Sequence, residues 1–266
     1  MATATPVVEE RRMSTGRVFQ RAFSAISINP IVILGLALVV GALPGLIMSY
    51  LLYRFGLSSP NALRTGAISP GGFAWAMFFS SMIMLVISAF VQGALTRATV
   101  SANEGTRASF GESLSAGVRV ILPLIGLSIL LALGVALGFI LLIVPGVILL
   151  LMWAVAVPAL VVERNGILAA FSRSAELTKG ARWKIFGLFL ALLVVYWLLS
   201  IIVGIVGLGM YAPTGATGFT ITNVIGGVVV GTIFNTLWGT IQPSLYVELR
   251  EWKEGTSIGN LAQVFA

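Results

Sequence analysis

Four long stretches without a charged residue dominate the pattern of apolar and polar positions along the chain. Residues 22–53 and 65–96 are uncharged runs of 32 residues each, residues 120–162 form a run of 43, and residues 185–247 form a run of 63. A helix needs about 20 apolar residues to cross a hydrocarbon core. The two shorter runs therefore predict one crossing each, and the two longer runs must each turn and cross back.

Proline and glycine mark the turning points, because both residues interrupt helices and favour turns. Residues 143–146 divide the third run, and residues 207–222 divide the fourth. The sequence thus predicts an all-α fold with six transmembrane helices, near residues 30–53, 73–95, 121–142, 147–162, 185–210 and 223–246. The fourth span has only 16 residues, so a partly re-entrant segment is the alternative to a full crossing. The runs do not alternate as barrel strands would.

Basic residues set the expected orientation. Fourteen of the sixteen Lys and Arg residues lie on one side of the six spans, and only Arg54 and Arg64 lie on the other. Because cytoplasmic loops carry the excess of Lys and Arg, both termini are expected in the cytoplasm. Residues 1–13 are predicted to be a mobile N-terminal tail, 14–255 the transmembrane domain and 256–266 a C-terminal tail. Tyr246 and Trp252 are predicted to lie in the inner belt of interfacial aromatics.

Three basic-side segments show helical spacing of apolar residues, one before each odd-numbered span. Ser109 and Glu112 form a candidate capping box for the second, and Gly180 is placed to end the third. We expect three amphipathic interfacial helices on the cytoplasmic side, with their charged faces, such as Arg17 and Arg21, turned to water and headgroups. A threefold repeat of interfacial helix and hairpin is one interpretation, and ordinary amphipathic loops are the other. The apolar positions are Val18, Phe19, Ala22, Phe23 and Ile26, then Phe110, Leu114, Val118 and Ile121, then Ile167, Leu168, Phe171 and Ala175.

Composition narrows the function classes. Charged residues make up 9% of the chain, against roughly a quarter in a soluble domain, and 58% of residues are apolar. A soluble globule, a disordered chain and a nucleic-acid-binding domain are therefore excluded. His, Cys and Asp are absent, which removes zinc sites, thiol nucleophiles, disulfides and imidazole bases. All nine Glu residues fall outside the predicted spans, and none is expected in a paired apolar setting that would raise its pKa. We expect no catalytic residue, no metal and no cofactor.

Neutral polar residues in the spans carry a second candidate feature. The predicted spans hold no ionisable side chain, which argues against a proton-driven pump or voltage sensor. Asn235, Thr236 and Thr240 of the sixth span and Gln92 of the second form a candidate intramembrane polar face. Small residues recur every four positions there, which favours close helix packing. The alternative interpretation is a polar lining for a solute path.

A group of short motifs resembles a known family. The turn Val144-Pro145-Gly146 is followed by Pro158, by Arg173-Ser174 and Gly180, and by Tyr246 and Arg250 near the end. The set resembles the membrane domain of some bacterial glycerophosphoryl diester phosphodiesterases and the related YciC-like integral membrane proteins, closely over about residues 110–255. The resemblance implies a six-helix membrane module of a bacterial inner membrane. It does not carry over phosphodiesterase chemistry, which depends in that family on histidines and metal-binding carboxylates of a separate soluble barrel.

These observations favour a non-enzymatic membrane scaffold, partner-binding or lipid-organising module. The alternatives are a flippase-like carrier or transporter of a neutral or amphiphilic solute, and a membrane component of glycerophosphodiester metabolism without catalytic residues of its own. The expected partners are anionic headgroups on the cytoplasmic face, and a membrane protein or a second copy of the chain, but not nucleic acid. The candidate contact patch is basic: Arg164, Arg173, Lys179, Arg182 and Lys184. Topology determination alone is the competing explanation for these cations.

Overall fold

The computed structural model describes residues 13–55, 57, 66, 69–211 and 221–255. The described part is helical and contains no strand. Its elements are α1 (Thr15–Ile28), α2 (Pro30–Gly35), the π-helix η1 (Leu36–Ala42), α3 (Leu43–Arg54), α4 (Pro70–Asn103), α5 (Phe110–Arg119), α6 (Ile121–Leu141), α7 (Ile143–Met152), α8 (Ala156–Glu163), α9 (Ile167–Thr178), α10 (Arg182–Tyr211) and α11 (Ile221–Glu254).

Six helical segments are long and apolar enough to cross a membrane, which confirms the number of predicted crossings by length and composition. They are Pro30–Arg54, Pro70–Asn103, Ile121–Leu141, Ile143–Glu163, Arg182–Ile205 and Val224–Glu254. The second and sixth are 34-residue helices, α4 and α11, and both run further towards their C-terminal ends than the sequence predicts. Glu248, Arg250 and Glu251 therefore continue the helix of the sixth span without a break.

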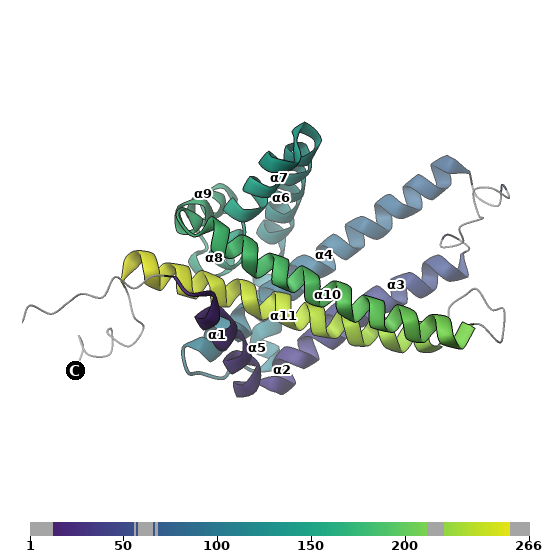
Figure 1. The fold of residues 1–266 in the computed structure, drawn as a ribbon, viewed down its shortest axis with the longest axis horizontal. Helices are drawn as coiled ribbons and strands as arrows, with labels where there is room; N and C mark the ends of the chain where they lie inside the picture. Colours follow the sequence, from purple (N-terminus) through teal and green to yellow (C-terminus); the bar gives the residue numbers. More distant parts are fainter. Residues whose placement is uncertain (1–12, 56, 58–65, 67–68, 212–220, 256–266) are drawn as a thin grey trace, which may run out of the picture.

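The order of elements follows one pattern three times. A short helix precedes a pair of long ones: α1 precedes α2–η1–α3 and α4, α5 precedes α6 and α7–α8, and α9 precedes α10 and α11. Figure 1 shows α1, α5 and α9 gathered towards the end of the molecule where α11 finishes, while the long helices spread away from that end. The three short helices thus share one end of the fold.

The fourth span is broken, and its turns differ from the predicted ones. The break before it is at Leu142, which has extended backbone (φ −163°, ψ 153°), so α7 begins at Ile143 rather than at residue 147. Pro145 lies in the first turn of α7, where a missing N–H costs no hydrogen bond. A second break, at Trp153–Val155, separates α7 from α8. The span is therefore two short helices of 10 and 8 residues, which cover 21 residues together with the break between them.

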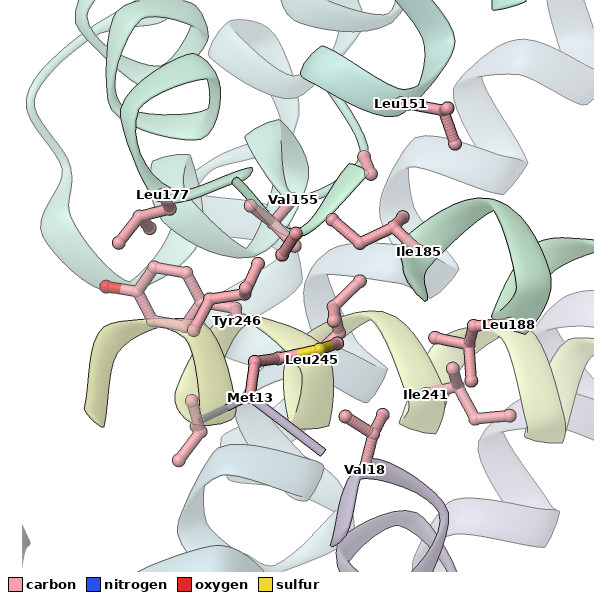
Figure 2. Packing of buried hydrophobic residues seen from close by; sticks show 14 of the residues in the cluster. Met13, Val18, Leu151, Val155, Leu177, Ile185, Leu188, Ile241, Leu245 and Tyr246 are labelled. Carbon is pink, nitrogen blue, oxygen red and sulfur yellow. The ribbon is translucent and has the colours of Figure 1, made fainter. Parts of the chain in front are cut away.

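A buried cluster joins the N-terminus of the described chain to the long helices. Met13 is 2% exposed and packs with Val18 of α1, Leu188 of α10 and Leu245 of α11. Figure 2 shows these side chains converging beside α11. The prediction of a mobile tail over residues 1–13 is thus wrong for Met13, because an apolar side chain here is removed from solvent. Residues 1–12 and the predicted tail 256–266 lie outside the described residues.

Candidate functional site at the charged end of the helices

One network of polar side chains joins the consecutive helices α8 and α9 to α11, which is distant in sequence. Arg173 of α9 donates from Nε to Glu163 Oε1 of α8 at 2.8 Å, and its guanidinium also pairs with Glu254 of α11. The Tyr246 hydroxyl of α11 donates to the same Glu163 oxygen at 2.7 Å. Arg250 pairs with Glu254 one turn away, at 3.1 Å. The motif residues Arg173, Tyr246 and Arg250 therefore form one α8–α9–α11 junction.

Two hydroxyls of α9, the motif residue Ser174 and Thr178 one turn later, bond to the backbone at the break between α7 and α8. The Ser174 hydroxyl donates to the carbonyl of Met152 at 2.9 Å and accepts the N–H of Val155 at 3.2 Å. The Thr178 hydroxyl also reaches the Met152 carbonyl, at 3.2 Å. Ser174 and Thr178 are fully buried. Because unpaired buried backbone groups are costly, these hydroxyls replace the helical bonds that the break removes.

A second network fastens α1 to α11. Glu248 Oε1 accepts from Arg17 at 2.6 Å and from the N–H of Ser14 at 3.1 Å. Arg21 pairs with Glu251 at 2.6 Å and lies 3.6 Å from Glu248. The Glu248 side chain is 2% exposed. Arg17 and Arg21 therefore turn towards the carboxylates of α11, although the Arg17 side chain stays 37% exposed.

The sequence analysis placed these glutamates outside the spans and left them unpaired. In the structure Glu163, Glu248, Glu251 and Glu254 each pair with arginine. Tyr246 is buried against protein at 1% exposure, and its predicted place in the inner aromatic belt stays a prediction. One signal was present: Arg17 and Arg21 are four residues apart and Glu248 and Glu251 three, so each pair lies on one helix face. Nothing in one sequence says that these two faces meet.

The predicted basic patch separates into different environments. Arg173 belongs to the α8–α9–α11 junction, and Lys184 Nζ donates to the carbonyl of Met13 at 2.7 Å. The Arg182 Nε atom is buried and has no partner among the described residues. Lys179 and Arg164 are exposed. Only the last two remain as open cations of the patch, and its role in lipid or partner contact stays a prediction.

The capping box is confirmed and belongs to α5. The Ser109 N–H donates to Glu112 Oε2 at 2.7 Å, and the Glu112 N–H donates to the Ser109 hydroxyl at 3.2 Å. The backbone and then the side-chain hydrogen bond of Ser109 lower the pKa of Glu112 below its ordinary value. The Glu112 carboxylate is therefore charged and forms part of the N-terminal cap of α5. Gly180, with φ +88°, follows the end of α9 as predicted.

The three short helices turn only part of their predicted apolar faces towards protein. In α1 the buried residues are Val18, Ala22 and Ala25, and Phe23 stays 55% exposed. In α5 the buried side is Ser113 and Gly117, while Val118 is 57% exposed. The predicted apolar faces of these helices therefore only partly coincide with the sides that are buried against protein.

In α9 the buried side differs from the predicted apolar face because of hydrogen bonds to another helix. Ala170, Ser174, Leu177 and Thr178 are buried, while Leu168 is 77% exposed. The helix is rotated so that Ser174 and Thr178 reach the chain break at Met152. A hydrogen-bonding demand from another helix thus decides which side of α9 is inside, and the apolar stripe alone does not report it.

Two polar side chains of the candidate intramembrane face, both on α11, donate hydrogen bonds to the backbone of the same helix. The Asn235 side chain donates to the carbonyl of Gly231 at 2.8 Å, and the Thr240 hydroxyl donates to the carbonyl of Thr236 at 2.7 Å. Thr236 and Thr240 are buried, and Gln92 of α4 is half-buried. The Thr236 hydroxyl oxygen has no partner among the described residues. Asn235 also lies against Gly41 of η1, where an added Cβ would be 3.1 Å from its amide.

Glycines of α11 meet neighbouring helices at two levels. A Cβ at Gly239 would lie 2.3 Å from Leu95 Cδ1 of α4, and one at Gly231 would lie 3.4 Å from Ala42 of η1. A Cβ at Gly227 would meet nothing within 4 Å. Close approach of α11 to α4 therefore requires glycine at residue 239, which supports the packing interpretation of the small residues.

We expect Gly239→Ala to destabilise the bundle by about 1–3 kcal/mol, because its methyl group overlaps Leu95, which is 1% exposed and has little room to move. Gly227→Ala is the matched control on the same helix, where space is open and helix propensity favours alanine. Thermal unfolding of the purified protein in one detergent measures both. Equal melting temperatures for the two variants would contradict close α4–α11 packing.

The remaining motif residues have structural settings. Gly146 lies under Phe139 of α6, since a Cβ there would be 2.5 Å from the ring, and Val144 beside it is 66% exposed. Pro158 is buried in the first turns of α8. Across the described residues no three carboxylates gather in a group that could hold a metal ion.

A pocket of about 430 Å³ lies among α4, α5 and α8. Its charged lining is Arg97, Arg119 and Arg164 with Glu104 and Glu112. The sequence analysis used Arg97 and Arg119 only for topology and assigned them no site, because nothing in the spacing brings residues 97, 119 and 164 together.

The geometry thus contains two ion-pair junctions that hold short helices to long ones, and one arginine-lined pocket beside them. Comparisons of the chain with protein-family models, with curated proteins and with solved structures find no match.

Proposed function

We propose that the chain is a non-enzymatic, multi-pass protein of a bacterial inner membrane that organises anionic lipid around its charged end. One observation carries the proposal: each short helix leaves a large apolar side chain uncovered, Phe23 on α1, Val118 on α5 and Leu168 on α9. All three helices lie towards one end of the fold (Figure 1). Uncovered apolar side chains on short amphipathic helices are typical of the boundary between headgroups and acyl chains.

Exposed cations accompany these side chains. Arg97, Arg107, Arg119, Arg164 and Lys179 are exposed and belong to α4, α5, α8, α9 or their connections. Each cation near an anionic leaflet contributes about 1 kcal/mol of attraction. With this end in the cytoplasm, as the excess of Lys and Arg there indicates, the basic residues meet the leaflet that carries anionic lipid.

The ion-pair junctions fit a structural role better than catalysis. Arg17 and Arg21 neutralise Glu248 and Glu251, and Arg173 bridges Glu163 and Glu254. Carboxylates engaged in this way hold helices in place, and none is left as a poised acid or base. The resemblance to the phosphodiesterase membrane domain supports a membrane module in glycerophosphodiester or lipid metabolism that acts beside catalytic proteins.

A carrier of a neutral or amphiphilic solute is the second candidate, favoured by the buried hydroxyls of Thr232 and Thr236, which have no partner among the described residues. A water-accessible path beside Asn235 would be required. Cysteines placed at residues 232 and 236 would then react with a small water-soluble reagent, whereas a closely packed bundle protects them.

The proposed function is tested by the depth and lipid surroundings of the short helices. The chain has no native cysteine, so single cysteines at Phe23, Val118 and Leu168 accept a fluorescent label without prior substitutions. In nanodiscs with lipids brominated near the glycerol end of the acyl chain, we expect strong quenching at all three positions. Brominated phosphatidylglycerol should quench more than brominated phosphatidylcholine at the same mole fraction.

Glu176 of α9 provides the control position, since it is exposed and charged on the same helix as Leu168. A label at residue 176 should be quenched less. Equal quenching by the two lipids would reject lipid organisation, and no quenching at residues 23, 118 and 168 would reject interfacial placement of the short helices.

A further inference from the structure

The pocket among α4, α5 and α8 is lined by both charged and apolar residues. Arg97 comes from α4, Arg119 from the last residue of α5, and Arg164 from the end of α8. Three different elements thus each supply one arginine to the lining of the same space of about 430 Å³. Convergence of this kind is what recognition of a multidentate anion requires.

The three arginines of the pocket lining outnumber its carboxylates. Arg97, Arg119 and Arg164 make no salt bridge within the part of the chain that the structure describes. The lining also holds two carboxylates, Glu104 and Glu112, and Glu112 accepts the N–H of Ser109 in the capping box of α5. Three guanidinium groups thus face two carboxylates, which leaves one net positive charge. The pocket therefore carries an excess of positive charge that an anion can balance.

Arg164 occupies a backbone conformation that favours glycine. Its φ is +52° and its ψ +29°, and it is the only non-glycine residue with positive φ in the described chain. Its N–H donates to the carbonyl of Leu160 at 3.0 Å, as in a left-handed helix cap. Glycine would avoid the steric cost at this position. Local strain of this kind, held by its surroundings, is common at ligand sites.

The rest of the lining decides which phosphate compound fits. Val100, Val120, Val161 and Val162 contribute apolar surface beside the charged groups. A free phosphate ion is hydrated on every side and gains nothing from valine side chains. A lipid presents a phosphodiester next to a glycerol and acyl carbons, so it can satisfy the arginines and cover the valines together.

We propose that this pocket binds the phosphodiester headgroup of a single anionic glycerophospholipid, with Arg97, Arg119 and Arg164 around the phosphate and the valines beside the glycerol and first acyl carbons. The proposal rests on the proposed function, since it names one specific lipid site within the charged end. It adds a stoichiometric, saturable site to the looser enrichment of lipid around the short helices.

The test uses the full-length protein in a neutral detergent and native mass spectrometry with short-chain phosphatidylglycerol. We expect one tightly retained lipid. Arg97→Gln, Arg119→Gln and Arg164→Gln should each weaken its binding about tenfold, because each removes a charge-assisted hydrogen bond. Arg107→Gln is the matched control: Arg107 is exposed in the same α4–α5 connection but is outside the pocket lining. Unchanged binding in all three variants, or an equal loss in the control, would overturn the proposal.

Competition separates the lipid from a free anion. Inorganic phosphate and glycerophosphoglycerol, which has the headgroup without acyl chains, should displace the lipid only at concentrations at least ten times higher. Displacement by inorganic phosphate as effective as by the lipid itself would overturn the lipid assignment. Ser115→Glu provides a second variant, since this exposed residue of α5 also lines the pocket and a carboxylate there should repel the headgroup.

Failure of this proposal and failure of the proposed function give different results. The arginine and Ser115 variants leave residues 23, 118 and 168 unchanged, so the quenching experiment can be repeated in them. If the arginine variants keep both the preference for brominated phosphatidylglycerol and the retained lipid, the pocket proposal is rejected and the proposed function stands. A retained lipid that the arginine variants lose, with no anionic preference in quenching, supports the pocket and rejects the wider enrichment.

Discussion

Replacing Glu248 with alanine should release α1 from the bundle and lower the free energy of unfolding by about 3 kcal/mol. The carboxylate is 2% exposed and accepts from Arg17 and from the backbone of Ser14. Removing one partner of a buried ion pair costs about 3–5 kcal/mol because the other is left uncompensated. The lower end applies here, since Arg17 is 37% exposed and can turn to water.

The loss is measured by thermal unfolding in detergent and by limited trypsin digestion. Once α1 detaches, its peptide bonds after Arg17 and Arg21 become accessible, so cleavage there should accelerate before the long helices are cut. Glu176→Ala is the control, because Glu176 is exposed and its side chain makes no ion pair within the described residues. Identical digestion patterns for the two variants would show that the Glu248 network does not hold α1.

Replacing Tyr246 with alanine should have an effect of similar or larger size, about 3–5 kcal/mol, as for other large core aromatics. Tyr246 is 1% exposed and packs where α1, α8, α9 and α11 approach one another (Figure 2). Its hydroxyl donates to Glu163, which Arg173 also binds. The substitution therefore removes packing and one bond of the junction together.

Tyr246→Phe separates the two contributions. It keeps the ring and removes only the hydrogen bond, so we expect a loss of about 1 kcal/mol. Tyr50→Ala is the control for truncation of a tyrosine, because Tyr50 is 46% exposed on α3. We expect the highest melting temperature for Tyr50→Ala, a lower one for Tyr246→Phe and the lowest for Tyr246→Ala. Equal effects of the alanine variants would place Tyr246 outside the core.

Several local features of the fold were readable from the sequence because they depend on short-range chemistry. The capping box at Ser109 and Glu112 and the glycine that follows α9 are decided by residues within one or two turns of each other. The exact break at Leu142 was missed because Pro145 is tolerated inside the first turn of a helix.

The candidate sites depended on contacts that sequence spacing does not encode. Arg173, Ser174 and Arg250 were singled out as motif residues, yet their partners Glu163, Met152 and Glu254 come from three different helices. The residues of the predicted basic patch lie in different environments for the same reason, since Arg173 and Lys184 have partners in α8, α11 and the segment before α1.

The sequence by itself determined that the chain forms six helical segments long and apolar enough to cross a membrane, because uncharged runs of 32 to 63 residues leave room for that number of apolar helices. Only the tertiary structure decided which carboxylate meets which arginine and which side of each short helix is covered. Hydropathy acts along the chain and can be read from it, whereas ion pairs and packing depend on the rotation and approach of whole helices. Those are fixed by contacts such as Gly239 against Leu95, between residues more than a hundred positions apart.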